Sequence, residues 1–317
     1  MLEISPCAPA DKELSLGIYN AVWPHDAITM DEVRSFEAGL IAHGDFLARV
    51  DGEPAGSGYG AVGSWRPDVV FLLLTVLPDK RTRGAGTGLY EAVSDWARER
   101  GLETLEAVVS DDDPESLAFA ERRGFVEHRR EKGVVLDLAE ADPPPVESPE
   151  GVEIVTWAER PELDRGMYEV ALEAYPDIPG GEDEEIEPFA EWLTNHMQGS
   201  GDLPEATFVA LAGDEVVGYA KFSLTNARPK VASHDLTAVK RAWRGRGVAR
   251  ALKATQIAWA KTNGYEQLWT RNEERNAPIR HLNEEFGYRP AVGRIYLRGP
   301  LGYAGQRNER ETSPVRT

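Results

Sequence analysis

The sequence predicts an α/β (α+β) protein built from two similar halves, each with a mixed central β-sheet flanked by helices. Three observations lead to this fold class. The chain has 317 residues, more than one compact domain usually contains. Several sequence landmarks recur at a nearly constant spacing in the second half, and a proline-rich stretch separates the two series. We therefore expect a duplication.

The repeat is carried by a motif with the frame V-x4-R-x2-G-x-[GA]. The motif begins at Val76 and again at Val239, 163 residues later. A Gly-aromatic pair that begins at Gly124 returns at Gly287, at the same spacing. Upstream, residues 46–56 parallel residues 208–218 at a spacing of 162, one residue fewer. Landmarks in register across half of the chain indicate two copies of one fold.

In the first copy, apolar runs and amphipathic periodicity predict the order of the elements. Thr29 is suited to cap the second helix, and Asp51-Gly52 is suited to turn a hairpin. Strands are expected at residues 2–5, 45–50, 55–62, 69–76 and 104–110 and after the last helix, and helices at residues 12–22, 30–42, 85–100 and 114–123.

The second copy repeats this order. Strands are expected at residues 153–156, 207–212, 216–224, 233–239, 267–271 and 293–297, and helices at residues 160–173, 187–197, 248–263 and 277–286. The expected division is a first domain over residues 1–140, a proline-rich linker over 141–150, a second domain over 151–303 and a disordered tail over 304–317.

Composition limits the class of protein. With 41% hydrophobic and 28% charged residues, the chain can build globular cores. Its apolar runs are shorter than a membrane span and its N-terminus does not resemble a secretory signal, so we expect no membrane partner. Cys7 is the single cysteine, which excludes an internal disulfide or thiolate metal cluster and fits a cytoplasmic protein without a metal. The net charge of −19 argues against nucleic-acid binding; it suits a cationic substrate or serves solubility.

Each copy of the motif joins an apolar strand to a long amphipathic helix. A helix N-terminus offers unpaired N–H groups and partial positive charge, glycine lets a phosphate approach the backbone, and arginine adds charge. The motif therefore predicts an anion site suited to a pyrophosphate. Neither copy fits the dinucleotide pattern G-x-G-x-x-G, and no loop ending in Gly-Lys-[Ser/Thr] occurs. The alternative is a glycine turn that only caps a helix.

The motif, followed by a β–α unit that ends in Gly-Phe or Gly-Tyr, resembles the GCN5-related N-acetyltransferase (GNAT) superfamily over nearly the whole chain. The resemblance implies two tandem GNAT folds that use acetyl-CoA as a co-substrate, with the motif amides on the coenzyme A pyrophosphate. The implied cofactor-binding residues are Ala238, Val239, Arg244, Gly245, Arg246, Gly247, Val248, Ala249 and Asn276 in the second copy, and Val76, Arg81, Arg83, Gly84, Ala85 and Gly86 in the first.

In this superfamily a base deprotonates the attacking ammonium group. Asp235, four residues before the motif valine, lies where members often have a His or an acid, whereas the first copy has Leu72. Strand alternation predicts that Asp235 shares a face with Ser233 and Thr237, and that His234 points to the other face. We interpret Asp235 as the base. A structural role for Asp235, and His234 as the base if a β-bulge shifts the strand, are the alternatives.

A tyrosine that protonates the leaving thiolate is common in the superfamily, four residues before the Gly-aromatic pair. Here that position holds Ala120 in the first copy and Asn283 in the second, where the amide could orient the thioester. The first copy also has Asp113, an acid that would face phosphates, in the place of Asn276. We therefore expect the second domain to catalyse, and the first to bind coenzyme A without turnover or to act as a scaffold.

The implied activity is transfer of acetyl to a primary amine of a small acceptor. Residues 179–187, between the first two helices of the second copy, contain five acids, which suits a cationic amine; a solvated charge run is the alternative. Tyr175, Trp192 and Tyr219 could wall the acceptor pocket or pack in the core. The missing tyrosine leaves a non-catalytic acyl-CoA-binding or scaffold protein as the rival function. We expect a monomer or homodimer.

Overall fold

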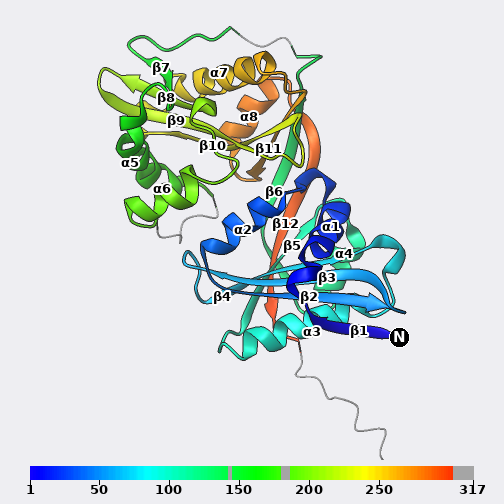
Figure 1. The fold of residues 1–317 in the computed structure, drawn as a ribbon. Coiled ribbons are helices and arrows are strands. Elements are labelled where there is room, and N and C mark those ends of the chain that lie inside the picture. The colour runs from blue at the N-terminus through cyan, green and yellow to red at the C-terminus, as the bar shows by residue number, and fades with distance from the viewer. Residues whose placement is uncertain (142–144, 180–185, 303–317) are drawn as a thin grey trace, which may run out of the picture.

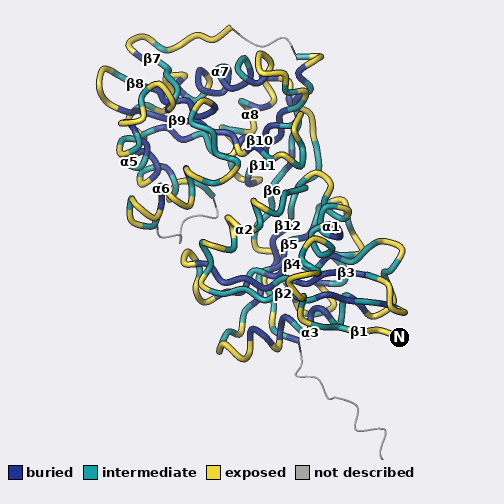
Figure 2. The backbone as a smooth tube through the Cα atoms, in the orientation of Figure 1, coloured by how far each residue is buried: buried dark blue, intermediate teal, exposed yellow. Residues whose placement is uncertain are grey.

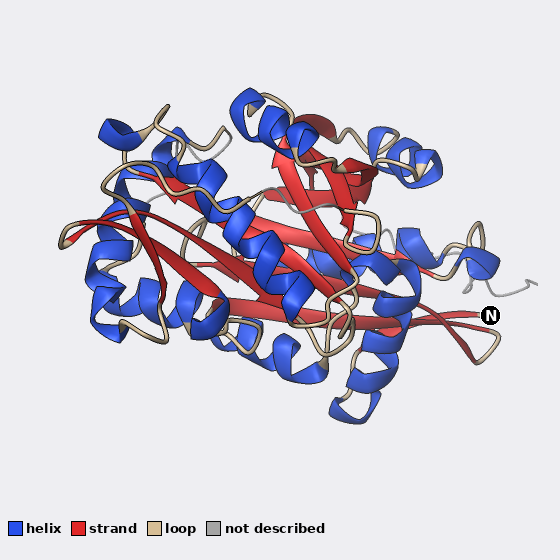
Figure 3. Ribbon diagram, turned by 90° about the horizontal axis from the view of Figure 1, so that it is seen from above, coloured by secondary structure: helices blue, strands red, loops and turns tan. Residues whose placement is uncertain are grey.

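The computed structural model describes residues 1–141, 145–179 and 186–302. Its centre is a 12-stranded mixed sheet with the strand order β1-β2-β3-β4-β5-β12-β6-β11-β10-β9-β8-β7. The sheet contains the strands of both halves, which lie one above the other in Figure 1, and the long strands β6 and β12 run between the halves. Helices cover both faces of the strands (Figure 3). The predicted class, two repeated α/β units, is confirmed.

The strands of each half follow the predicted order. The N-terminal half contains β1 (Leu2–Pro6), β2 (Leu40–Val50), β3 (Glu53–Gly63), β4 (Val69–Val76) and β5 (Thr104–Ser110), and its last strand in sequence is β6 (Val126–Asp137). The C-terminal half contains β7 (Glu153–Thr156), β8 (Thr207–Ala212), β9 (Glu215–Leu224), β10 (Val231–Val239), β11 (Gln267–Glu273) and β12 (Arg289–Pro300).

The helices are α1 (Lys12–Val22), α2 (Met30–Ala38), α3 (Ala85–Arg98) and α4 (Pro114–Glu121), followed by α5 (Asp164–Ala174), α6 (Phe189–Met197), α7 (Val248–Thr262) and α8 (Ala277–Glu285). Thr29 caps α2 through a reciprocal box with Glu32, as its sequence position predicts. The expected helix over 30–42 was wrong at its C-terminal end. It stops at Ala38 because Leu40 already pairs with Gly63 in the sheet.

Each half has the same layers. Helices α1 and α2 lie on one face of the N-terminal strands and α3 and α4 on the other, and α5 and α6 stand opposite α7 and α8 in the same way. Buried residues, dark blue in Figure 2, follow the central strands and the inner sides of the helices. No described helix is long and apolar enough to cross a membrane.

The two halves exchange their last strands. β6, from the N-terminal half, pairs antiparallel with β11, from Asp137 opposite Gln267 to Glu131 opposite Glu273. β12, from the C-terminal half, pairs antiparallel with β5. β6 and β12 also pair with each other at the middle of the sheet. Each half is therefore completed by a strand that the other half supplies, which the repeat in the sequence does not reveal.

In both halves two neighbouring parallel strands separate partway along their length. β4 pairs with β5 only from Val69 to Leu72, and β10 pairs with β11 only from Val231 to Ser233. Beyond these points each strand pair is open. We call each opening the splay of its half.

One residue distinguishes the two splays. The β3–β4 register runs without interruption, with Gly60 opposite Leu72, whereas in β10 it shifts between His234 and Leu236. Phe222, 162 residues after Gly60, lies opposite His234, so His234 is the structural equivalent of Leu72. Asp235 is the additional residue, in a β-bulge. The extra residue in this bulge therefore accounts for the change in the spacing of the sequence repeat from 162 to 163 residues.

Candidate functional site

The two motif loops adopt the same backbone conformation. In the N-terminal half, Thr82 and Gly84 have positive φ angles of 65° and 87°. In the C-terminal half, Gly245 and Gly247 have φ angles of 72° and 88°. Gly84 and Gly247 precede α3 and α7 at the N-cap position and, having no side chain, make no cap hydrogen bond to either helix. Both helix N-termini therefore keep N–H groups free for an anion, as the phosphate site requires.

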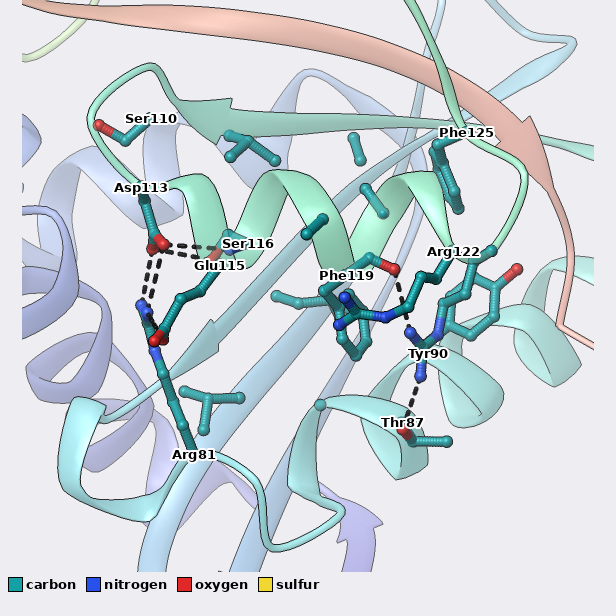
Figure 4. Close-up of a pocket in the computed structure, with 18 of the residues that line it drawn as sticks. Arg81, Thr87, Tyr90, Ser110, Asp113, Glu115, Ser116, Phe119, Arg122 and Phe125 are labelled. Atoms are coloured by element: carbon teal, nitrogen blue, oxygen red, sulfur yellow. Dashed lines mark hydrogen bonds and ion pairs between the residues drawn. The ribbon is translucent and has the colours of Figure 1, made fainter.

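The N-terminal loop opens into a large cavity on the α3 and α4 face of the sheet. Its volume is about 810 Å³. Apolar strand residues, among them Leu72 and Val109, form its floor where β4 and β5 separate. Figure 4 shows Arg81 at one end of this cavity and Tyr90 and Phe125 at the other. The cavity extends from the phosphate loop to the splay, as a site for an extended nucleotide thioester must.

Arg81 is already paired in this cavity. Its guanidinium contacts both carboxylate oxygens of Asp113, at 3.3 and 2.7 Å, and Glu115 at 3.2 Å (Figure 4). Asp113 also accepts hydrogen bonds from the backbone and hydroxyl of Ser116. Burial opposes ionisation of Asp113, but the bonds from Arg81 and Ser116 outweigh it and lower its pKa. An anion at this loop must therefore compete with two carboxylates for Arg81.

The motif arginine of the C-terminal loop is also paired with an aspartate, but this aspartate precedes the acidic loop instead of a helix on the cofactor face. Arg244 donates from Nε to the carbonyl of Val239 at 3.0 Å and from Nη1 to Asp177 at 2.6 Å. Arg241 donates to the same carboxylate at 2.7 Å. Hydrogen bonds from the two arginines lower the pKa of Asp177. Asp177 comes just before the acidic loop, and residues 180–185 of that loop lie outside the described residues.

The remaining implied cofactor residues flank these loops. Asn276 precedes α8, as Asp113 precedes α4, but its side chain makes no cap hydrogen bond and is available to a ligand. Arg83 and Arg246 are exposed, and Ala85 and Val248 are buried at the first turns of α3 and α7. Val76, Ala238, Val239, Gly86 and Ala249 complete the strand ends and helix starts on either side.

The cofactor face of the C-terminal splay is more polar than its N-terminal equivalent. Asn283 is 1% exposed and donates from Nδ2 to Oδ1 of Asn272 at 2.7 Å. Its own Oδ1 is buried, and it has no partner in the described part of the chain. Five cavity positions of the N-terminal half, Leu72, Leu74, Ala107, Val109 and Ala120, correspond to His234, Thr237, Thr270, Asn272 and Asn283.

Asp235 points to the acceptor face, which we define as the face of the C-terminal sheet covered by α5 and α6. It contacts the ammonium of Lys221 at 3.0 Å. Lys221 is 4% exposed, and it also contacts Asp202 at 2.6 Å. Burial lowers the pKa of Lys221, but Asp235 and Asp202 outweigh burial and raise it. A buried, charged lysine therefore holds Asp235, whose side chain stays 47% exposed.

The expected grouping of Ser233, Asp235 and Thr237 on one face was wrong, because the bulge interrupts the alternation. Asp235 turns toward Lys221, whereas Thr237 pairs with Ala220, which packs in the core under α7. His234 also lies on the α7 side.

His234 is enclosed by polar and aromatic partners. Its Nδ1 lies 3.0 Å from Gln256 Oε1 and its Nε2 lies 2.5 Å from the Tyr288 hydroxyl. Burial lowers the pKa of His234 well below its usual value, with the nearby Lys253 contributing, so the ring is neutral at physiological pH. His234 therefore lies on the opposite face from Asp235.

The acceptor-face aromatics pack together. Trp192 and Tyr219 are fully buried in the core between α5, α6 and the sheet, and Tyr175 packs against this core. Burial raises the pKa values of Tyr175 and Tyr219, and the charge of Asp235 also raises both.

Residues from the N-terminal half also reach the acceptor face, which the sequence does not predict. The ring of His25 stacks on Trp269 with the ring centroids 4.8 Å apart. Asp26 binds Arg271 through two hydrogen bonds, at 2.7 and 3.0 Å.

A second cavity, of about 260 Å³, lies on the α1 and α2 face of the N-terminal half. Trp23 and Val108 line both this cavity and the larger one. The cavities therefore approach each other from opposite faces at the N-terminal splay.

These features define a protein with two splayed strand pairs in one sheet and two phosphate-binding loops, the arrangement of an acyl-CoA-dependent transferase. The profile of the Acetyltransferase (GNAT) family matches residues 13–125 and 165–288. The chain belongs to this family and is an N-acetyltransferase. Members of the family use acetyl-CoA.

Two relatives and two solved structures are similar. Mycothiol acetyltransferase of Acidothermus cellulolyticus is 29% identical over 255 residues, 75% of this chain and 74% of that protein. L-2,4-diaminobutyric acid acetyltransferase of Nocardia farcinica is 37% identical over 83 residues, 25% of this chain and 43% of that protein. A tandem GNAT protein from the clavulanic acid biosynthesis pathway has a TM-score of 0.75 at 22% identity, covering 95% of this chain and 99% of that one. A GCN5-related N-acetyltransferase from Sphaerobacter thermophilus has a TM-score of 0.73 at 22% identity, covering 95% and 96%.

Proposed function

We propose that the C-terminal half transfers acetyl from acetyl-CoA to a primary amine of a small, cationic acceptor, and that the N-terminal half binds acetyl-CoA without turnover. The position of Asp235 carries this proposal. The bulge places a half-exposed carboxylate at the mouth of the C-terminal splay, on the face from which an amine can approach. In the N-terminal half the equivalent strand has no bulge, and its cavity floor there is formed by Leu72 and Leu74.

The proposed reaction is a direct attack. The free N–H groups at the start of α7 hold the pyrophosphate, and Asn276 contacts the cofactor beside them. Asp235 accepts a proton from the ammonium group, directly or through one water molecule. The neutral amine then attacks the thioester carbonyl in the splay. The C–N bond forms, the C–S bond breaks, the nitrogen loses its second proton to solvent, and the thiolate takes a proton from solvent. Asn283 can orient the thioester from the cofactor face, and positioning supplies much of the rate.

The relatives support an amine acceptor. Both are named as acetyltransferases of small molecules, and one is named for a diamino acid. The net charge of −19 and the five acids of residues 179–187 favour a positively charged acceptor.

The test is release of coenzyme A thiol from acetyl-CoA across polyamines, aminoglycosides, amino acids and short peptides. Asp235→Asn should lower kcat by about 100-fold or more while acetyl-CoA affinity stays within twofold. Asp214→Asn, at an exposed hairpin turn of the same half, is the matched control and should leave the rate unchanged. An unaffected rate in Asp235→Asn would refute Asp235 as the base. Acetyl-CoA binding without release on any acceptor would favour the rival binding or scaffold function.

A further inference from the structure

We propose that the acceptor also carries a carboxylate, which Arg228 binds at the seam between the two halves. This inference rests on the proposed function of the C-terminal half and names the acceptor class more narrowly. It places an amine at Asp235 and an anionic group at the other end of the same molecule. Three observations carry it: the geometry of the splay, the charge of Arg228, which no carboxylate among the described residues pairs with, and the contribution of the N-terminal half.

The geometry concerns the acceptor face of β10 and β11. Ser233 and Trp269 are the last paired residues before the strands separate. Asp235 and Arg271 follow two residues later on the two strands, so they flank the mouth of the splay. Arg228, in the loop before β10, lies with its Nη2 3.3 Å from the hydroxyl of Ser233. Two residues of a regular strand span about 7 Å and the bulge at Asp235 shortens this rise, so Arg228, which contacts Ser233, and Asp235 lie within the reach of one small amino acid with a side-chain amine.

The charge balance around Arg228 favours an anion. Asp26 is engaged by two other arginines, Arg271 at 2.7 Å and Arg294 at 2.9 Å. Glu32, the other acid that faces Arg228, accepts hydrogen bonds from Thr29 and Thr225.

Arg228 has no carboxylate within 4.0 Å in the described parts of the chain, and its buried Nε has no hydrogen-bond partner there. Burial lowers the pKa of Arg228, and Arg271 lowers it further, although Asp26 opposes the shift. A partly buried guanidinium whose Nε lacks an acceptor and whose charge lacks a carboxylate partner is costly, and a carboxylate offers the two oxygens that match its donors.

The N-terminal half completes this subsite. His25 stacks on Trp269, and Tyr19 donates from its hydroxyl to the carbonyl of Asp26. These contacts fix the loop between α1 and α2 against the acceptor face. The acceptor class that fits is a small amino acid with a second amine, or an ω-amino acid, that spans from Arg228 to Asp235.

The experiment compares L-2,4-diaminobutyrate with 1,3-diaminopropane, which is the same molecule without its carboxylate. The full-length protein should use diaminobutyrate with a KM about 10- to 100-fold lower. Arg228→Gln should abolish this preference by raising the KM for diaminobutyrate. Lys230→Gln, two residues away in the same loop and exposed, is the matched control and should keep the preference.

Calorimetric binding in the presence of coenzyme A separates this inference from the proposed function. Binding of diaminobutyrate that weakens in Arg228→Gln, without turnover of either amine, would keep the subsite and refute the catalysis. Equal use of the two amines, or an unchanged preference in Arg228→Gln, would overturn the subsite. The subsite would also be overturned if neither 4-aminobutyrate, diaminobutyrate nor lysine bound more tightly than the corresponding amine without a carboxylate.

Discussion

Asp113 and Asn276 occupy the same position in the two halves, each directly before a helix that borders the cofactor face, yet only Asp113 binds the arginine of its phosphate loop. The Asp113 carboxylate lies 2.7 Å from Arg81, whereas the Asn276 side chain makes no cap hydrogen bond. The N-terminal loop therefore has an internal competitor for its ligand, at a position where the C-terminal half has a neutral amide.

We expect Asp113→Asn to increase the affinity of the N-terminal half for acetyl-CoA by about 3- to 10-fold. The change frees Arg81 from a charged partner and keeps a side chain that can cap α4. Isothermal titration of the full-length protein, with the C-terminal site blocked by Arg244→Glu, measures this affinity. Ser116→Ala, which removes a contact to Asp113 but no charge, is the control. An unchanged or weaker affinity would contradict the competition.

We expect Arg244→Glu to lower kcat/KM by about 100-fold, and Arg81→Glu to leave more than half of it. Each substitution places a negative charge beside a phosphate loop, but only the C-terminal loop serves the proposed catalytic site. Steady-state thiol release measures the rate, and titration with acetyl-CoA counts the remaining binding sites. Equal losses of activity in the two variants would contradict the division of labour between the halves.

We expect Asp26→Asn to lower the free energy of unfolding at pH 7 by about 3 kcal/mol, since it leaves two largely buried arginines without their carboxylate. Burial raises the pKa of Asp26, but Arg294 and Arg271 outweigh it and hold the pKa below its usual value. The stabilisation by Asp26 is therefore complete above about pH 4 and is lost as the pH falls through the folded-state pKa.

Urea unfolding between pH 2 and pH 7 measures this difference. Asp31→Asn, which breaks an exposed ion pair with Arg34 on α2, should cost less than about 1 kcal/mol. A cost for Asp26→Asn as small as that of the control would show that the ion pairs across the seam contribute little.

Lys253 gives a prediction of opposite sign. It is fully buried, and burial lowers its pKa to about 7. The unfolded chain, in which a lysine has a pKa near 10.4, therefore binds one more proton than the folded chain between about pH 7 and pH 10. The loss of stability that the burial of Lys253 causes is therefore greatest below pH 7. It diminishes as the pH rises from pH 7 toward pH 10, by about 1.4 kcal/mol per pH unit.

We expect Lys253→Met to be more stable than the parent protein at pH 7, with the difference closing toward pH 10. Chemical unfolding at each pH measures both proteins, and Lys261→Met, at an exposed position on the same helix, is the control. Stability curves of the parent and Lys253→Met that stay parallel from pH 7 to pH 10 would contradict the prediction.

The sequence predicted the repeat, the two phosphate loops and most of the element order, because these depend on local patterns. Strands β4, β5, β7 and β8 have the expected bounds, and the motif glycines Gly84, Gly245 and Gly247 have positive φ angles. The end of α2 was predicted too late. Its amphipathic pattern continues past Ala38, but pairing with β3 extends the strand back to Leu40.

The face on which Asp235 lies could not be predicted from alternation alone. The one-residue change in repeat spacing showed that an insertion existed somewhere between residues 218 and 239, and only the strand register places it at Asp235. The role of Lys221 and the contacts of Asp26 with Arg271 were equally inaccessible, since they join residues from different elements and different halves. Catalytic and cofactor roles of the named residues stay predictions.

The exchange of β6 and β12 has a consequence for how this protein can be divided. A fragment that ends after β6 would contain a strand whose partner β11 is missing, and its β5 would present an open edge to solvent. In a dimer of two such fragments, β6 of each fragment could pair with the open edge of the other. We therefore expect the isolated N-terminal half to form a reciprocal dimer or to aggregate. The covalent duplication would then be a single-chain version of a domain-swapped dimer, in which two once-identical subunits became free to diverge.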